Sequence, residues 1–334
     1  MRKIFIIAAI LLFTVVACRK DNKTDGPSIS EIYSSFKVMT PFAVSNDTVD
    51  FEAGQKAIFS ASFNKIVNWE ITVTGLSSNA RKVITGQSRE INAINATWNG
   101  STSVFPMFKQ ENCIAKLKIE NETDSFMLPV RIAKTKIDQG FIIADFESGL
   151  KTAWTKFIQN GASMDFKVKA DATAPQAGAY LNMAGTVNWD WLIGLVDFPA
   201  SAYGTAKTFA LNSNPDNVYL NCLIYGDASA ANTSLVLFQL KEDENADGVI
   251  NASSDDEYDY EIKVDWSGWK LISIKYSDIV TLVNGQPTTP KGNAQHNPDK
   301  LGKISMLHLA NPNNGFASTK IDYIVFTNDK PLEP

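Results

Sequence analysis

The chain has 334 residues, of which 44% are hydrophobic and 20% are charged, and its formal net charge is −5. This balance is that of a globular protein and not of a disordered one. Phosphate binding needs concentrated Lys and Arg, and no basic cluster occurs, so we expect no nucleic-acid partner. The two His and three Cys residues have no zinc-site spacing, and no serine nucleophile motif accompanies either His.

Residues 1–17 have the pattern of a secretory signal. A basic start, Met1-Arg2-Lys3, precedes an apolar run from Ile4 to Ala17, which is shorter than the roughly 20 residues of a membrane span. The run ends at Cys18, and the polar residues 18–29 are predicted to be a flexible tether. A plain secretory peptide with an incidental Cys is the alternative interpretation.

The segment Val15-Val16-Ala17-Cys18 resembles the lipobox of bacterial lipoproteins, with Val15 replacing the usual Leu. The resemblance implies that the signal is cut before Cys18 and that this thiol is lipidated. The pair Lys20-Asp21 is similar to the surface-export signal of Bacteroidota lipoproteins. We therefore expect an outer-membrane protein, lipid-anchored and facing the cell exterior, that contacts the membrane through its lipid anchor only.

The 317 residues after the signal suit two domains, and the predicted fold class is all-β. Residues 30–136 contain short alternating runs such as Ala57–Phe63 and Asn68–Thr74, which predict an immunoglobulin-like sandwich. This region resembles immunoglobulin-like spacer domains of bacterial surface proteins, which makes Trp69 and Trp98 core residues.

Residues 139–330 contain about nine further strand patterns separated by long loops, which predict a C-terminal jelly-roll β-sandwich. Cys113 and Cys222 each lie in an alternating strand pattern, one in each predicted domain. We expect both to be buried free thiols and not a disulfide.

Three segments of the second domain, Ala144–Glu147, Val264–Ile274 and Lys320–Phe326, resemble galactose-binding-like jelly rolls, notably carbohydrate-binding modules of family eleven. The resemblance implies a glycan-binding domain. It also implies a structural calcium ion held by carboxylates of the first and last strands, for which Glu147 and Asp322 are the candidates. Ordinary polar strand residues are the alternative.

A second calcium prediction comes from the acidic run that begins at Asp243. Oxygen side chains at positions 1, 3, 5 and 9, with Gly at position 6, match the opening of an EF-hand-type loop. Position 12 is Ser254 and not the usual bidentate acid, and no flanking helices are predicted. The alternative is a solvated acidic turn. The candidate ligands are Asp243, Asn245, Asp247, the Val249 carbonyl, Asn251 and Asp255.

Aromatic rings can stack on the apolar faces of sugars while nearby polar groups bind the hydroxyls. In Asn188-Trp189-Asp190-Trp191 both indoles lie on the same side of an extended segment. Trp154 and Tyr203 lie in neighbouring loop-like stretches. The sequence therefore predicts a carbohydrate site of Trp154, Trp189, Asp190, Trp191 and Tyr203, against the alternative that each ring packs in the core. Trp269, which begins an apolar strand, is predicted to be a core residue.

The run Glu257-Tyr258-Asp259-Tyr260-Glu261 resembles the acidic strand of sandwich-fold glycosidases, with Glu257 and Glu261 as the catalytic pair. An acidic outer strand face is the simpler interpretation. We predict a non-enzymatic protein that binds polysaccharide or oligosaccharide, with calcium as a structural ion and an outer-membrane importer complex as a further partner. The alternatives are a glycosidase and a protein-binding adhesin.

Overall fold

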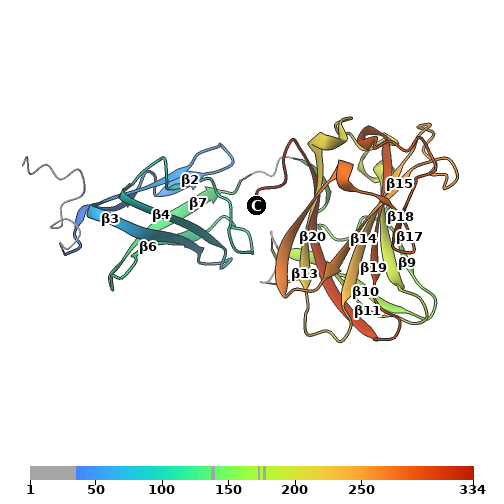
Figure 1. Ribbon diagram of the computed structural model, residues 1–334, viewed down its shortest axis with the longest axis horizontal. Helices are drawn as coiled ribbons and strands as arrows, with labels where there is room; N and C mark the ends of the chain where they lie inside the picture. Colours follow the sequence, from blue (N-terminus) through green and yellow to red (C-terminus); the bar gives the residue numbers. More distant parts are fainter. Residues whose placement is uncertain (1–34, 137–139, 172–173, 176–177) are drawn as a thin grey trace, which may run out of the picture.

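The computed structural model describes residues 35–136, 140–171, 174–175 and 178–334. The predicted signal, Cys18 and the tether lie outside the described residues. Two β-domains lie one after the other along the long axis of the molecule (Figure 1). The described residues form strands and short 3₁₀ turns. In this described part, no helix is long and apolar enough to cross a membrane.

The first domain is one seven-stranded sheet system in which β3 is the central strand. The sheet order is β1-β3-β6-β7-β2, and β4 and β5 also pair with β3. The pairing of β3 with β4 shifts register between Ser62 and Val67. The first half of β3 also pairs with β1, and its second half also pairs with β6. The strands are β1 (Val38–Val44), β2 (Thr48–Asp50), β3 (Ala57–Gly75), β4 (Arg81–Ile91), β5 (Thr97–Trp98), β6 (Asn112–Ile119) and β7 (Ser125–Lys134).

Alternation along these strands builds the core of the first domain. Residues of β3 are buried at every second position, as expected for a strand with one face against a core. Trp98 is fully buried between Phe51 and Phe108, with both ring centroids 4.8 Å away and edge-on. Trp69 is buried as well, so the prediction that both tryptophans are core residues is confirmed.

The second domain is a sandwich of a six-stranded and a five-stranded sheet, and β17 and β18 form a separate two-stranded sheet. The first has the order β10-β11-β20-β13-β16, with β8 beside β20, and the second has the order β15-β14-β19-β12-β9. The strands are β8 (Phe141–Ala144), β9 (Thr155–Ile158), β10 (Ser163–Ala170), β11 (Ala179–Thr186), β12 (Leu192–Pro199), β13 (Val218–Gly226), β14 (Ser234–Glu242), β15 (Glu257–Val264), β16 (Gly268–Lys275), β17 (Thr281–Val283), β18 (Gln286–Thr288), β19 (Leu301–Leu309) and β20 (Phe316–Asn328).

A large apolar core fills the space between these two sheets. Leu220, Cys222 and Ile224 of β13 face Val236 and Phe238 of β14 in one buried cluster. Cys113 and Cys222 are both buried free thiols, as predicted. The all-β class, a small sandwich followed by a jelly-roll-like sandwich, is therefore confirmed.

Candidate functional site

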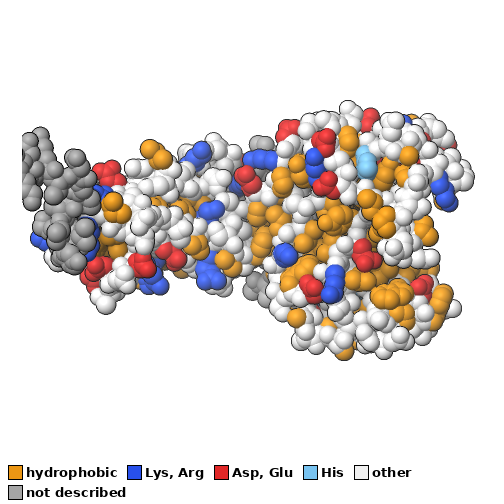
Figure 2. Space-filling view, in the orientation of Figure 1, with side chains coloured by type: hydrophobic (Ala, Val, Ile, Leu, Met, Phe, Trp, Pro, Cys, Tyr) orange, Lys and Arg blue, Asp and Glu red, His pale blue; other side chains and the backbone are white. Residues whose placement is uncertain are grey.

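The outer face of the five-stranded sheet, turned away from the core, carries a row of leucines. Leu237 on β14 pairs with Leu307 on β19, which pairs with Leu195 on β12, and residues paired in this way point to the same side of a sheet. Leu235 and Leu309 form a second such pair. We call these five residues the leucine floor. In Figure 2, orange side chains gather over the part of the domain where Figure 1 labels β14 and β19.

A polar row runs beside the leucine floor on the same outer face. Asp197, Ser305 and Gln239 are register partners across β12, β19 and β14. The Ser305 hydroxyl donates to Asp197 Oδ1 at 2.6 Å, and Gln239 Nε2 donates to the carboxylates of Glu257 and Asp259. The outer face therefore combines an apolar surface with fixed hydrogen-bonding groups.

Exposed aromatic residues lie at the β9–β12 edge of this sheet. Trp189 is 65% exposed and Trp191 is 47% exposed, in the segment that leads into β12. The Trp189 indole N–H donates to the Asn160 carbonyl at 3.1 Å, and Gln159 Nε2 donates to Asp190 Oδ2 at 3.1 Å. These bonds hold the segment against the end of β9, where Phe157 is also exposed. Two of the predicted aromatic side chains thus have ring surface available to a ligand.

The structure corrects the placement of the other two predicted aromatic residues. Trp154 is only 6% exposed, and its ring packs edge-on against Phe146 and Phe198. Tyr203 packs against Phe141 and donates its hydroxyl to the Ile143 carbonyl at 2.7 Å. Both belong to the packing of the sandwich and have no free ring face for a sugar.

Trp269 was predicted to be a core residue, and the structure places it outside the main core. This residue is half-buried on the outer face of the six-stranded sheet, outside the main core. Its ring lies edge-on to Tyr180 and Tyr225, and Lys320 Nζ lies over both tyrosine rings. Its strand is half-buried at most positions, so the apolar pattern does not identify the inward face.

The predicted calcium loop is closed by its own backbone. Asp243 accepts the N–H groups of Asp247 and Gly248 at 3.2 and 2.6 Å, and Asp255 accepts those of Glu244 and Asn251. The remaining predicted ligands, Asn245, Asp247, Val249 and Asn251, lie on the exposed part of the loop. Within the described chain, these carboxylates do not form a group of three that could share one ion.

Glu147 and Asp322 have different environments. Glu147 is exposed, and its Oε1 accepts the N–H groups of Gly178 and Ala179 at the start of β11. Asp322 is fully buried, and its Oδ1 accepts the N–H of Tyr323 at 2.7 Å. Neither belongs to a cluster of three acidic, Cys or His side chains among the described residues. A calcium ion at this pair stays a prediction.

The acidic strand alternates as predicted, with Tyr258 in the core and Glu261 exposed. Glu257 forms an ion pair with Lys241 at 2.8 Å. Between the two glutamates, Asp259 is buried and its Oδ2 accepts the Leu282 N–H at 2.8 Å. A residue of strand β17 thus covers the central carboxylate.

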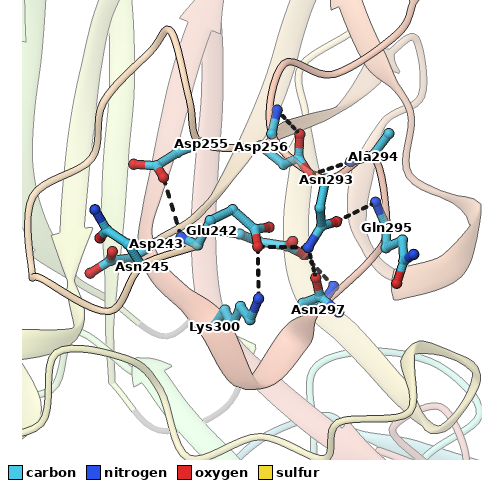
Figure 3. Close-up of polar contacts among 12 residues, drawn as sticks. Glu242, Asp243, Asn245, Asp255, Asp256, Asn293, Ala294, Gln295, Asn297 and Lys300 are labelled. Atoms are coloured by element: carbon cyan, nitrogen blue, oxygen red, sulfur yellow. Dashed lines mark hydrogen bonds and ion pairs between the residues drawn. The ribbon is translucent and has the colours of Figure 1, made fainter.

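The sequence reasoning missed a second acidic cluster beside the predicted loop. Glu242, Glu244 and Asp256 place one oxygen each within 4.8 Å of one another. Figure 3 labels two of them, Glu242 and Asp256. Burial raises the pKa of Glu242 to about 8, against the opposing effect of hydrogen bonds from Tyr276 and Asn297. The sequence does show acidic residues at both ends of the loop. The prediction of a calcium site instead followed the EF-hand-type spacing between them.

Comparison with protein-family models gives no match, and no curated protein matches the chain. Solved structures with similarity include a family 11 carbohydrate-binding module from Clostridium thermocellum, at 18% identity and a TM-score of 0.39. The similar region covers 58% of this chain and 97% of that module. A carbohydrate-binding module of the β-sandwich superfamily covers 87% of this chain and 98% of its own, at 10% identity and a TM-score of 0.40.

A xylan-binding domain from Paenibacillus barcinonensis is also similar, at 16% identity and a TM-score of 0.32, over 58% of this chain and 98% of that domain. These three structural neighbours are carbohydrate-binding modules or domains. Likeness this distant carries no conclusion about the ligand of this chain, so the site residues must support one.

Proposed function

We propose that the C-terminal sandwich binds a polysaccharide or oligosaccharide and does not cleave it. The observation that carries the proposal is the pair of exposed indoles, Trp189 and Trp191, at the edge of the outer sheet face. A flat ring fixed by a hydrogen bond offers a sugar an apolar surface at little entropic cost. Asp190 lies between the two tryptophans in the sequence, and its carboxylate accepts hydrogen bonds from Gln159 Nε2 and the Trp191 N–H.

The neighbouring face supports this proposal through its polar groups. Sugar hydroxyls need fixed donors and acceptors, and Asp197 and Gln239 are partly exposed groups of this kind on the outer side of the same sheet, with Ser305 buried between them. An extended face with aromatic residues at its edge suits a polysaccharide or oligosaccharide better than a single small molecule. A bound glycan would cross from the tryptophan segment onto the polar row.

Protein binding is the second candidate, and the leucine floor is the observation that favours it. Leu195, Leu235, Leu237 and Leu309 are half-buried side chains that belong to none of the core clusters of the described chain. Contiguous apolar surface of this kind is typical of protein-interaction sites. The second candidate predicts affinity for a protein partner that persists when the tryptophans are removed.

We further propose that lipidation of Cys18 holds this domain at the outer membrane, facing outward, where it presents glycan to an importer complex. The support is the lipobox-like sequence before Cys18 and the polar tether after it. Incorporation of a fatty acid probe into the wild type but not into Cys18→Ser would support the anchor. Equal labelling of both proteins would overturn it.

Affinity electrophoresis tests the glycan proposal most directly. The chain without residues 1–17, carrying Cys18→Ser, is run through gels that contain one neutral or acidic polysaccharide each. We expect slower migration in at least one gel and no release of reducing ends on incubation. Unchanged migration in every gel would overturn glycan binding, and released reducing ends would favour the glycosidase alternative.

A further inference from the structure

The neck of the β14–β15 hairpin gathers three acidic side chains. Glu242 is the last residue of β14, and Asp256 directly precedes β15. The Glu242 N–H donates to the Asp256 carbonyl at 2.9 Å, so the two residues are held side by side. Glu244 follows two positions after Glu242. We call Glu242, Glu244 and Asp256 the acidic neck. Figure 3 labels Glu242 and Asp256 together with Asn293, Ala294 and Asn297.

Glu242 is the most constrained member of the acidic neck. Its side chain is fully buried. Its Oε1 accepts hydrogen bonds from the Tyr276 hydroxyl and the Asn297 N–H, each at 2.8 Å. Its Oε2 is buried and has no hydrogen-bond partner. A buried carboxylate oxygen without a partner is costly, so this atom points to a ligand.

Glu244 shares this incomplete pairing, whereas both carboxylate oxygens of Asp256 have a hydrogen-bond partner. Glu244 Oε2 contacts Lys300 Nζ at 2.7 Å, whereas its Oε1 is buried and has no partner. Asp256 accepts the backbone N–H groups of Gly292 and Ala294. Three carboxylates therefore face one ammonium group, and two of their oxygens are unsatisfied.

We propose that the acidic neck binds one hard divalent cation, with Ca²⁺ as the ion. Ligands on opposite sides of Ca²⁺ are about 5 Å apart, twice the usual calcium–oxygen distance. The three neck oxygens lie within 4.8 Å of one another, so they fit around a single ion. Carboxylate oxygens are the ligands that such a cation prefers, and water can complete the coordination shell.

This site differs from the predicted calcium loop, although both lie in the β14–β15 connection. In the loop, Asp243 and Asp255 each accept two backbone N–H groups, and neither belongs to the group of three acids whose oxygens lie within 4.8 Å of one another. The neck instead joins the hairpin to the segment that follows β18, through Gly292, Ala294 and Asn297. A bound cation would tie these two segments together. The site stands apart from the glycan proposal, and neither depends on the other.

Calorimetric titration of Ca²⁺ alone into the chelator-treated chain tests the site. We expect one ion per chain in the wild type and at least tenfold weaker binding in Glu244→Gln, which removes a ligand charge but keeps the shape. The matched control is Asp247→Asn on the exposed loop, which should bind as the wild type does. Thermal melting in chelator shows whether each variant is folded.

Lys300→Met provides a readout that misfolding cannot mimic. Its ammonium group competes with the cation for Glu244 Oε2, so its loss should tighten Ca²⁺ binding at least threefold. Absence of Ca²⁺ binding by the wild type at millimolar concentration would overturn the proposal. So would a loss of binding in Asp247→Asn that equals or exceeds the loss in Glu244→Gln, because the ion would then lie in the loop.

Discussion

The backbone N–H of Thr102 in the first domain donates a hydrogen bond to the carbonyl oxygen of Pro334, at 2.8 Å. The segment that follows β20 thus lies between the two domains. Lys136 Nζ also donates to the Glu333 carbonyl at 2.8 Å. Leu332 packs with Leu223 on the outer face of the six-stranded sheet, against a cluster that includes residues of the first domain. These contacts join the segment after β20 to both domains.

Leu332→Ala should destabilise the protein by about 2 kcal/mol, because a nearly buried leucine loses its apolar contacts. The Leu332 N–H donates to the side chain of buried Asn221 at 3.0 Å, and this bond survives the substitution. Urea unfolding of the whole chain measures the effect. The matched control is Leu76→Ala, since Leu76 is 59% exposed and should change stability little. Equal effects of both substitutions would contradict the packing role of Leu332.

Trp189→Ala and Trp191→Ala should each weaken glycan binding at least tenfold, because truncation of an anchoring tryptophan costs about 2 kcal/mol of binding free energy. The measurement is affinity electrophoresis in the polysaccharide that retards the wild type. Both residues are exposed, so the variants should unfold at the wild-type temperature.

The control for these variants is Met127→Ala, which removes an equally exposed apolar side chain from the first domain. It should leave binding unchanged. If both tryptophan variants migrate as slowly as the wild type in the polysaccharide gel, this segment is excluded as the glycan site. The leucine floor or the outer face of the six-stranded sheet would then be the remaining surfaces to test.

Strand alternation predicted much of the fold because burial on one face leaves a local pattern. The alternation of Glu257 to Glu261 is confirmed, and so are the core positions of Trp69 and Trp98. Residues 57–63 and 68–74 were predicted as separate strands, but they form one strand, β3, because a register shift and not a turn lies between them.

The sites were harder to predict because they depend on residues distant in sequence. Trp154 is buried because Phe198, 44 positions later, packs against its ring. Nothing near Trp154 in the sequence reveals that contact. The acidic neck likewise needs the segment around Asn297, which follows Glu242 by 55 positions. The loop motif between Asp243 and Asn251 was visible because its spacing is local.

Gly86→Ala should destabilise the first domain by about 1–3 kcal/mol through overpacking. Gly86 on β4 pairs with Trp69 on β3, and a methyl group at this glycine would lie 2.3 Å from Cζ2 of the indole. Trp69 cannot move freely, because it is buried and donates to the Ser88 hydroxyl at 2.9 Å. Urea unfolding measures the loss.

A double-mutant cycle provides the control for Gly86→Ala. On a Trp69→Leu background the ring is absent, so the added methyl group should cost much less than in the wild type. An equal cost on both backgrounds would mean that the backbone conformation of Gly86, and not the indole, sets the penalty.

His308 should make the folded protein less stable as the pH falls below about 6.5. The ring is fully buried on β19, its Nε2 lies 3.1 Å from the Ser234 hydroxyl oxygen, and burial lowers its pKa to about 3. The unfolded chain therefore binds the proton at a higher pH than the folded chain does. Stability is fully present above the unfolded pKa and declines towards the folded pKa, by about 1.4 kcal/mol per pH unit.

Urea unfolding at pH 7.5 and pH 5 measures this dependence, with His308→Gln as the control. Glutamine keeps a polar side chain of similar length but does not titrate, so carboxylates and other groups contribute alike in both proteins. Between these two pH values the wild type should lose about 2 kcal/mol more free energy of unfolding than the variant does. An equal loss in both would mean that His308 is protonated in the folded state, which its burial without a charged partner opposes.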